Sequence, residues 1–205
     1  GEAYVRDLPV EPLQETPRRE ELIADVPVDS IYIAFHGPDR LHEDYHAMDL
    51  LSDVLSRGSS SRLYRALVKE QRLFSEVNAY VMGSTDSNLF VVEGKPAAGV
   101  AMDAAEAALW EQLIKIKNQL VSADEIEKIK NKMESTMVFA ELSILDKAMN
   151  LAYFEALGDA QLYNEEVDRY LAVTASSLQK VAQQIFQPNN SSTLIYYAKE
   201  QADVK

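Results

Sequence analysis

Cysteine is absent from this sequence of 205 residues, so disulfide bonds and thiolate chemistry are both excluded. The sequence also lacks any run of eighteen or more apolar residues, so we expect no membrane span. Basic residues are few: 20 lysines and arginines face 33 aspartates and glutamates, a net charge of −13. A protein that binds nucleic acid normally presents a basic surface, so this charge disfavours nucleic acid as a partner. A chain without cysteine suits a bacterial cytoplasm and a periplasm equally, and the compartment stays open.

Hydrophobic residues make up 47% of the chain and charged residues 26%, a balance typical of a globular domain rather than a disordered one. The length fits one domain with a filled core and is short for two. Residues 1–20 form a polar run broken by three prolines, which predicts an interdomain linker or an extended arm. Residues 21–205 then form a single domain. Because the sequence opens on Gly1, we expect it to be part of a longer protein.

Hydrophobic periodicity predicts the order of strands and helices along the chain. The predicted strands cover residues 21–28, 31–35, 75–81, 89–93 and 193–197. The predicted helices cover residues 43–57, about 62–68, 97–119, 123–157, 162–171 and 175–186. Two strands thus precede two helices, a β-hairpin, several helices and a closing strand. This segregation predicts an α+β domain, with a mostly antiparallel sheet of about five strands and helices packed on one face.

Five segments in a fixed order carry a family resemblance. They are IAFHGP (33–38), YHAMDLL (45–51), LSRGSSSRLY (55–64), VSADEI (121–126) and VTASSLQKVA (173–182). With them the chain resembles the carboxy-terminal-type domain of the pitrilysin/insulinase family of zinc metallopeptidases, which includes mitochondrial processing peptidase. The likeness covers nearly all of the chain after residue 20.

The resemblance implies a longer protein with two similar α+β halves that close over a peptide substrate. In the family, the amino-terminal half carries an inverted zinc motif, His-x-x-Glu-His plus a distal Glu, in which the Glu acts as base on zinc-bound water. This chain contains no such motif. The resemblance therefore implies no catalytic residue, no metal ligand and no cofactor here, with zinc held by the amino-terminal half or by a partner. On this reading the chain is the non-catalytic domain of a metalloendopeptidase and is inactive alone.

A second family feature is degenerate in this sequence. Many active relatives place an Arg and a Tyr, seven residues apart, in this domain to bind the substrate backbone. The matching positions hold Val68, which has no donor, and Ser75, which is too short. Arg72, Phe74 and Ser75 are the remaining substrate-facing candidates. In heterodimeric members a partner supplies the pair, so a homologous subunit is an expected partner.

Two alternatives stay open. The first is a catalytically silent scaffold or partner-binding subunit of the same fold. The second is a stand-alone zincin, because His42, Glu43 and His46 match His-Glu-x-x-His. Against the zincin, the preceding proline places His42 at a helix start, and both histidines continue a helical line through Asp49 and Asp53. That line predicts a solvated face with two exposed histidines.

The same helix should bury its apolar stripe. Leu51 and Leu55 follow the three- and four-residue spacing of a core-facing helix surface. We therefore expect these two leucines to lie in the core, on the side opposite the acidic line.

Overall fold

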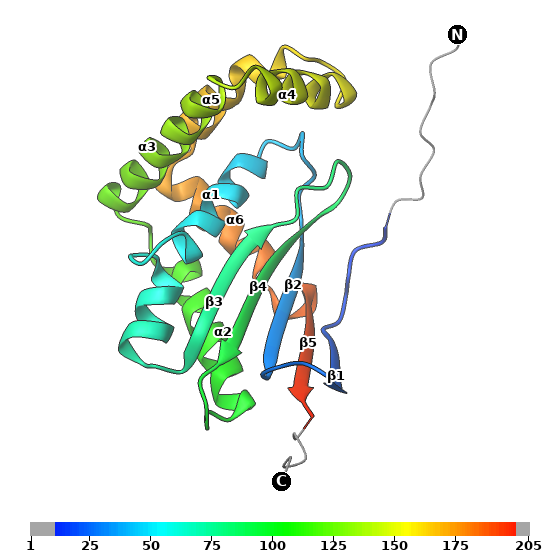
Figure 1. Cartoon of the computed structure of the whole chain (residues 1–205), viewed down its shortest axis with the longest axis vertical. Helices are drawn as coiled ribbons and strands as arrows, with labels where there is room; N and C mark the ends of the chain where they lie inside the picture. The colour runs from blue at the N-terminus through cyan, green and yellow to red at the C-terminus, as the bar shows by residue number, and fades with distance from the viewer. Residues whose placement is uncertain (1–10, 200–205) are drawn as a thin grey trace.

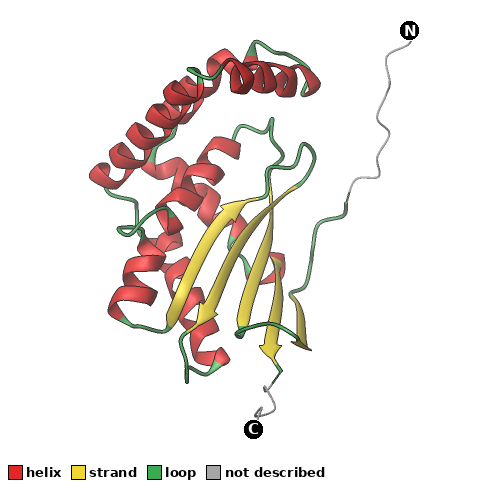
Figure 2. Ribbon diagram, viewed as in Figure 1, coloured by secondary structure: helices red, strands yellow, loops and turns green. Residues whose placement is uncertain are grey.

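The computed structural model describes residues 11–199, which form one five-stranded sheet with helices on one face (Figures 1 and 2). The strands are β1 (Arg18–Ala24), β2 (Ser30–Gly37), β3 (Phe74–Val81), β4 (Asn88–Pro96) and β5 (Ser191–Ala198). The helices are α1 (Tyr45–Ser56), α2 (Met102–Asn118), α3 (Ala123–Ala140), α4 (Ile144–Ala156), α5 (Leu162–Ala172) and α6 (Ala175–Ile185), with a π-helix η1 (Tyr64–Glu70) and a 3-10 turn η2 (Pro188–Asn190). None of these helices is long and apolar enough to cross a membrane.

The strand order across the sheet is β1-β5-β2-β4-β3. Each neighbouring pair is antiparallel except β1 and β5, which run parallel. The predicted α+β class, with about five strands in a mostly antiparallel sheet, is confirmed. The first strand begins at Arg18, within the segment expected to be a linker or arm. Strand β3 pairs only with β4 among the described residues, so it forms the edge of the sheet opposite β1 (Figure 1).

The core lies between the sheet and the helices that cover one of its faces. Ile33 and Phe35 of β2 are fully buried, as are Leu51 and Leu55 of α1. Phe35 also makes an edge-to-face contact with Phe186 at the end of α6, with ring centroids 5.2 Å apart. The prediction that Leu51 and Leu55 face the core is confirmed.

The prediction of a solvated acidic face on α1 is wrong. Asp49 accepts a hydrogen bond of 2.7 Å from the hydroxyl of Tyr170 on α5. Asp53 is largely buried and forms an ion pair of 2.9 Å with Arg57, and burial raises the pKa of its carboxyl group. Helix α1 is covered by the sheet on one side and by α3 and α5 on another, so its acidic line faces helices rather than water.

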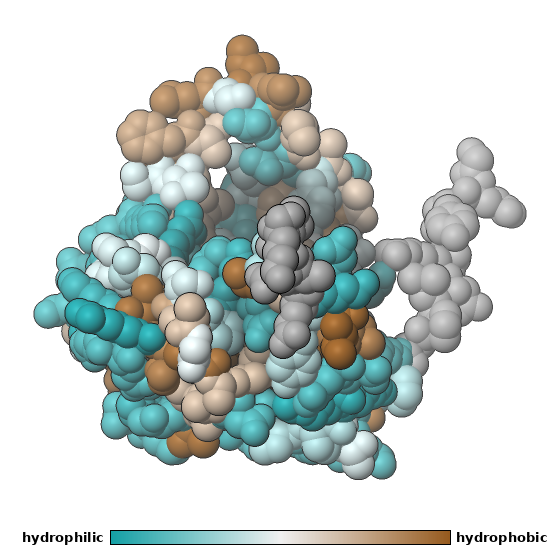
Figure 3. Space-filling view, turned by 60° about the horizontal axis from the view of Figure 1, so that its bottom comes forward, coloured by the Kyte–Doolittle hydropathy of each residue, from teal (hydrophilic) through white to brown (hydrophobic). Residues whose placement is uncertain are grey.

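The predicted long helix over residues 123–157 is two helices. Helix α3 ends at Ala140, and the hydroxyl of Ser143 accepts a hydrogen bond from the amide of Asp146 and so caps α4. Together α3, α4 and α5 form an arm that arches over α1 (Figure 1). Figure 3 shows a hydrophobic region at the top of the molecule. Six large apolar side chains of the arm are exposed: Val138, Phe139, Leu142, Ile144, Leu145 and Met149.

Helix α3 begins with a capping box formed by Ser122 and Glu125. The Ser122 hydroxyl accepts from the amide of Glu125 at 3.3 Å, and the Glu125 carboxylate accepts from the amide of Ser122 at 3.1 Å. The same carboxylate accepts two hydrogen bonds of 2.9 Å from Arg62. These hydrogen bonds from Arg62 lower the pKa of Glu125 to about 2.

Glu125→Ala is expected to lower the free energy of unfolding by about 1 kcal/mol at pH 7, because it removes the carboxylate that accepts from the Ser122 amide and from Arg62, while the Ser122 cap stays in place. The exposed Glu127→Ala on the same helix is the control, with a change within about 0.5 kcal/mol. The folded pKa of Glu125 lies below its ordinary value of 4.5, so its stabilisation is present above pH 4.5 and is lost as the pH falls towards about 2. Urea unfolding across that range should show wild type and Glu125→Ala converging in acid. If the difference in the free energy of unfolding between the two proteins did not narrow in acid, the stabilising role of the Glu125 carboxylate would be contradicted.

Candidate functional site

Two of the three histidines in the chain lie at the start of α1, where the zincin pattern falls. His42 is exposed, and its Nδ1 accepts a hydrogen bond of 3.1 Å from the amide of Asp44. His46 is only 4% exposed, and its Nε2 lies 3.0 Å from Oε1 of Glu166 on α5. The expectation of two exposed histidines is therefore wrong for His46, because α5 packs over this part of α1.

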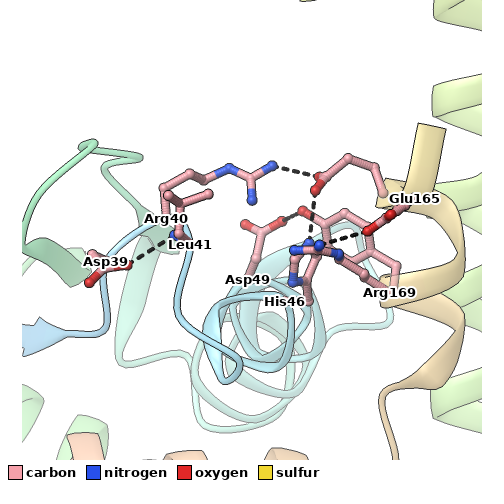
Figure 4. A network of polar contacts seen from close by, with 9 residues as sticks. Asp39, Arg40, Leu41, His46, Asp49, Glu165 and Arg169 are labelled. Carbon is pink, nitrogen blue, oxygen red and sulfur yellow. Dashed lines mark hydrogen bonds and ion pairs between the residues drawn. The ribbon is translucent and has the colours of Figure 1, made fainter. Parts of the chain in front are cut away.

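His46 belongs to a buried ionic network (Figure 4). Arg40, in the loop before α1, places Nη2 2.6 Å from Oε2 of Glu166. The Arg40 guanidinium also lies over two aromatic rings, 4.4 Å from the centroid of Tyr45 and 5.2 Å from that of Phe154. Arg40 is 7% exposed and Glu166 is 3% exposed. The network therefore joins the loop before α1 to both α4 and α5.

The charges of this network are matched to one another. Burial by itself would raise the pKa of Glu166, but the hydrogen bond from His46 and the charge of Arg40 outweigh it and lower the pKa overall. Burial lowers the pKa of Arg40, yet the charge of Glu166 more than compensates and raises it. The carboxylate of Glu166 is thus held ionised between two donors. Because its oxygens are occupied by Arg40 and His46, this carboxylate positions helices and is not set up to accept a proton from a substrate.

The zinc that the family resemblance implies does not fit the histidines of α1. In the described part of the chain, no group of three or more His, Cys, Asp or Glu side chains is placed to hold a metal ion. His42 uses Nδ1 for the Asp44 amide and His46 uses Nε2 for Glu166, so one nitrogen of each imidazole is already engaged within the protein. The stand-alone zincin hypothesis therefore has no support in the geometry.

The substrate-facing candidates lie where η1 meets β3. Arg72 is exposed and has φ 55°, the left-handed region that residues other than glycine adopt rarely. Ser75 is exposed, and its hydroxyl donates a 3.1 Å hydrogen bond to the carbonyl of Lys95. Val68 is half-buried and packs against the core.

Phe74 does not belong with these candidates. Its side chain is 2% exposed and lies in the core, so it cannot face a substrate. The ring fits there because residue 94 is a glycine: a Cβ at Gly94 would lie 2.5 Å from the Phe74 ring. The structure thus brings Arg72 and Ser75 to one exposed corner and removes Phe74 from it.

Sequence reasoning missed Arg40 and Glu166. A signal for Glu166 was present, since it shares the buried face of α5 with Tyr163 and Tyr170 at helical spacing. A charged residue within such a stripe needs a buried partner. Nothing in the local sequence identifies that partner as Arg40, which lies 126 residues earlier.

Residues 11–199 thus form an α+β domain with an open-edged sheet and a one-sided helical layer, without a group of side chains placed to hold a metal ion. Residues 4–133 match the family described as the peptidase M16 inactive domain. This match covers more than half of the chain, so the protein belongs to the peptidase M16 inactive domain family.

Individual relatives agree with this assignment. The zinc protease PqqE of Helicobacter pylori is 27% identical over 187 residues, which are 90% of this chain and 42% of that protein. A crystallised protease from Helicobacter pylori superposes with a TM-score of 0.85 at 25% identity, over 91% of this chain and 45% of the other. A crystallised inactive peptidase domain from Bordetella parapertussis has the same fold, with a TM-score of 0.80 at 22% identity over 89% of this chain and 97% of the other. The chain thus spans less than half the length of the zinc protease it matches.

Proposed function

We propose that this domain is the non-catalytic half of a zinc metalloendopeptidase and encloses a peptide substrate opposite a zinc-bearing half. One observation carries the proposal: the chain matches an inactive peptidase domain, yet it corresponds to only 42% of the zinc protease PqqE. The rest of such a protein has room for a second half of similar size. The poor fit of zinc to His42 and His46 supports the assignment of the metal to that other half.

We assign substrate contact to the corner between η1 and β3. Arg72 carries an exposed charge on a backbone conformation that costs about 1–3 kcal/mol, and such strain tends to gather at functional positions. The preceding η1 is a π-helix, a rare form that often occurs at functional sites. Strand β3 adds an edge to which an extended peptide can align. Ser75 lies at the irregular start of this strand.

This corner lacks a complete clamp for the substrate backbone. Val68 offers no hydrogen-bond donor, and the short Ser75 side chain is already bonded to the Lys95 carbonyl. We therefore propose that a homologous subunit supplies the missing Arg and Tyr, giving a heterodimer. The same deficiency supports a second candidate function, a catalytically silent scaffold of the same fold. A His-x-x-Glu-His sequence in the remainder of the full-length protein would favour the peptidase, and its absence would favour the scaffold.

The test compares the full-length protein alone, the full-length protein with its homologue, and the Val68→Arg/Ser75→Tyr double variant. Zinc content and cleavage of a flexible peptide are measured in each case. Activity should require the homologue or be partly restored by the double variant, because misplacing a peptide by about 1 Å can cost on the order of a hundredfold in rate. Arg72→Ala should raise KM more than it lowers kcat.

The domain by itself should bind no stoichiometric zinc and cleave nothing. Tight zinc binding and peptide cleavage by the isolated domain, both lost in His42→Ala, would overturn the proposal. His42 is suited to this control because it is exposed, so its replacement leaves the core intact. If the full-length wild-type protein were fully active as a verified homo-oligomer, only the proposal that a homologous subunit supplies the Arg and Tyr would be contradicted.

A further inference from the structure

A polar groove of about 630 Å³ lies between η1, α2 and the start of α3, on the helical side of the domain. We call it the α2–α3 groove. A smaller hollow between α1 and α3 adjoins it, and the two share Ser60, Glu125 and Lys128 in their walls. The groove is separate from the buried network of Arg40, since none of the residues of that network lines it.

Basic residues outnumber acidic residues in the lining of the groove and hollow, although acidic residues outnumber basic ones in the whole chain. The basic residues are Arg57, Arg62, Arg65, Lys115, Lys128 and Lys132. The acidic residues are Asp53, Glu70, Asp124 and Glu125. Six of the 20 basic residues of the chain thus gather here with only four of the 33 acidic ones. The lining residues carry two more positive than negative charges, although the whole chain has a net charge of −13. Arg57, Arg62, Arg65 and Lys115 are paired with Asp53, Glu125, Glu70 and Glu111, whereas Lys128 and Lys132 form no ion pair among residues 11–199. These two lysines are the positive charges available to a negatively charged ligand.

Two buried polar side chains at this place have an unused hydrogen-bonding group. Gln112 of α2 is 7% exposed and lines the groove, and its Nε2 has no partner among residues 11–199. Ser61 is 5% exposed and lines the adjoining hollow, and its Oγ likewise has no partner there. Burying a polar group without a partner costs about 1–3 kcal/mol, which a ligand that accepts a hydrogen bond would recover. The terminal torsion of glutamine is broad, so Gln112 can turn its amide N–H towards the groove.

The start of α3 also borders the groove. Ser122 and Asp124 lie at its wall, and the Glu125 carboxylate already accepts a hydrogen bond from the Ser122 amide there. The helix end is therefore occupied by a carboxylate of the chain itself. The positive charges of Lys128 and Lys132 and the two unpartnered groups favour the same kind of ligand, an anion that accepts hydrogen bonds.

We infer that the α2–α3 groove binds a carboxylate presented by an extended peptide, either its free carboxyl terminus or an acidic side chain. A peptide suits the groove better than a compact multivalent anion does. Glu70, Asp124 and Glu125 would repel a compact anion, whereas they can accept hydrogen bonds from the amide groups of a peptide. The inference goes beyond the proposed function, since binding here needs neither zinc nor a second half.

Fluorescence anisotropy of the complete chain with labelled octapeptides tests the inference. One peptide carries four glutamates and a free carboxyl terminus, and a second carries the same glutamates with a terminal amide. A third carries glutamines with a free carboxyl terminus, and a fourth carries glutamines with a terminal amide. We expect the first peptide to bind and the fourth, which has no carboxylate, not to bind. Binding of the second peptide would show that side-chain carboxylates are recognised, and binding of the third would show that the terminal carboxylate is recognised.

Three variants locate the binding. Arg65→Glu reverses an exposed charge in the groove, and Gln112→Leu removes the amide without changing the side-chain size greatly. Each should weaken binding of the first peptide about tenfold or more, because a hydrogen bond to a charged group is worth about 1.5–3 kcal/mol. Lys147→Glu, an equal charge reversal on exposed α4, should leave binding unchanged. Thermal unfolding of each variant checks that it is folded, and Gln112→Leu should be as stable as wild type or more so.

Several outcomes would overturn the inference. Equal weakening by Arg65→Glu and Lys147→Glu would show general attraction between charges rather than a site. Equal binding of all four peptides would show that the groove does not recognise a carboxylate. If none of the peptides bound, the groove would not be a peptide-binding site. Competition by inorganic phosphate as strong as that by unlabelled first peptide would assign the groove to compact anions. Each of these results leaves the zinc and cleavage tests of the proposed function unaffected.

Discussion

Glu166→Gln is expected to lower the free energy of unfolding by about 3–5 kcal/mol, because it leaves the charge of Arg40 buried without a counter-charge. Arg40 Nη2 lies 2.6 Å from Glu166, and both side chains are almost fully buried. The amide of glutamine keeps the size of the side chain, removes its charge and replaces one acceptor oxygen with an NH2 donor. Chemical denaturation at pH 7 measures the change.

The neighbouring residue offers a matched control. Glu165 precedes Glu166 on α5 but points to the surface, where it pairs with Arg169 at 2.7 Å and is 59% exposed (Figure 4). Glu165→Gln should therefore change the stability by no more than about 0.5 kcal/mol. The double variant Arg40→Met/Glu166→Leu should recover much of the loss, since apolar replacement of a buried pair is often neutral. Equal effects at Glu165 and Glu166 would contradict the network.

The difference in stability between wild type and Glu166→Gln should also depend on pH. The folded state holds the pKa of Glu166 below its ordinary value of 4.5, so the unfolded state binds a proton first as the pH falls. The stabilisation from Glu166 is therefore complete above pH 4.5 and is lost as the pH drops through the lowered folded pKa. Glu166→Gln lacks this contribution, and its stability should approach that of wild type in acid.

Leu51→Ala is expected to cost about 2–5 kcal/mol, because the leucine is fully buried between α1 and the rest of the core. The loss combines the hydrophobic free energy of the removed atoms with the cavity they leave. Leu145→Ala on α4 is the control, since that leucine is 68% exposed and should give a change within about 0.5 kcal/mol. Denaturant unfolding of both variants measures the difference. Small, equal effects would mean that another face of α1 is buried.

Asp53→Ala is not a neutral surface change in this structure. The carboxylate is mostly shielded by α3 and pairs with Arg57, whereas the periodicity of α1 placed it in water. The periodicity also wrongly predicted that His46 and Asp49, on the same side of the helix, face solvent. In each case a helix that is distant in the sequence covers a surface that is polar in its own residues.

Phe74 shows the same limit on a strand. Its neighbours Arg72 and Ser75 are exposed, and no local pattern distinguished it from them. Its burial depends on Gly94 in the neighbouring strand β4, which pairs with Val77 of β3. Because Gly94 has no side chain, it leaves room for the Phe74 ring. A residue 20 positions away therefore decided which of the candidates can meet a substrate.

The sequence by itself determined the order of strands and helices apart from the break between α3 and α4, the starts of α3 and α6, and the burial of Leu51 and Leu55. These features depend on spacing and capping within a few residues, so local chemistry specifies them. Only the tertiary structure decided the parallel pairing of β1 with β5, the ionic network of Arg40 and the α2–α3 groove. Each of them brings together segments that are distant in the sequence: β1 and β5, Arg40 and Glu166, and η1 and the start of α3. The hydrophobic periodicity of a helix or strand shows which of its faces is buried or polar, but it does not show what packs against that face.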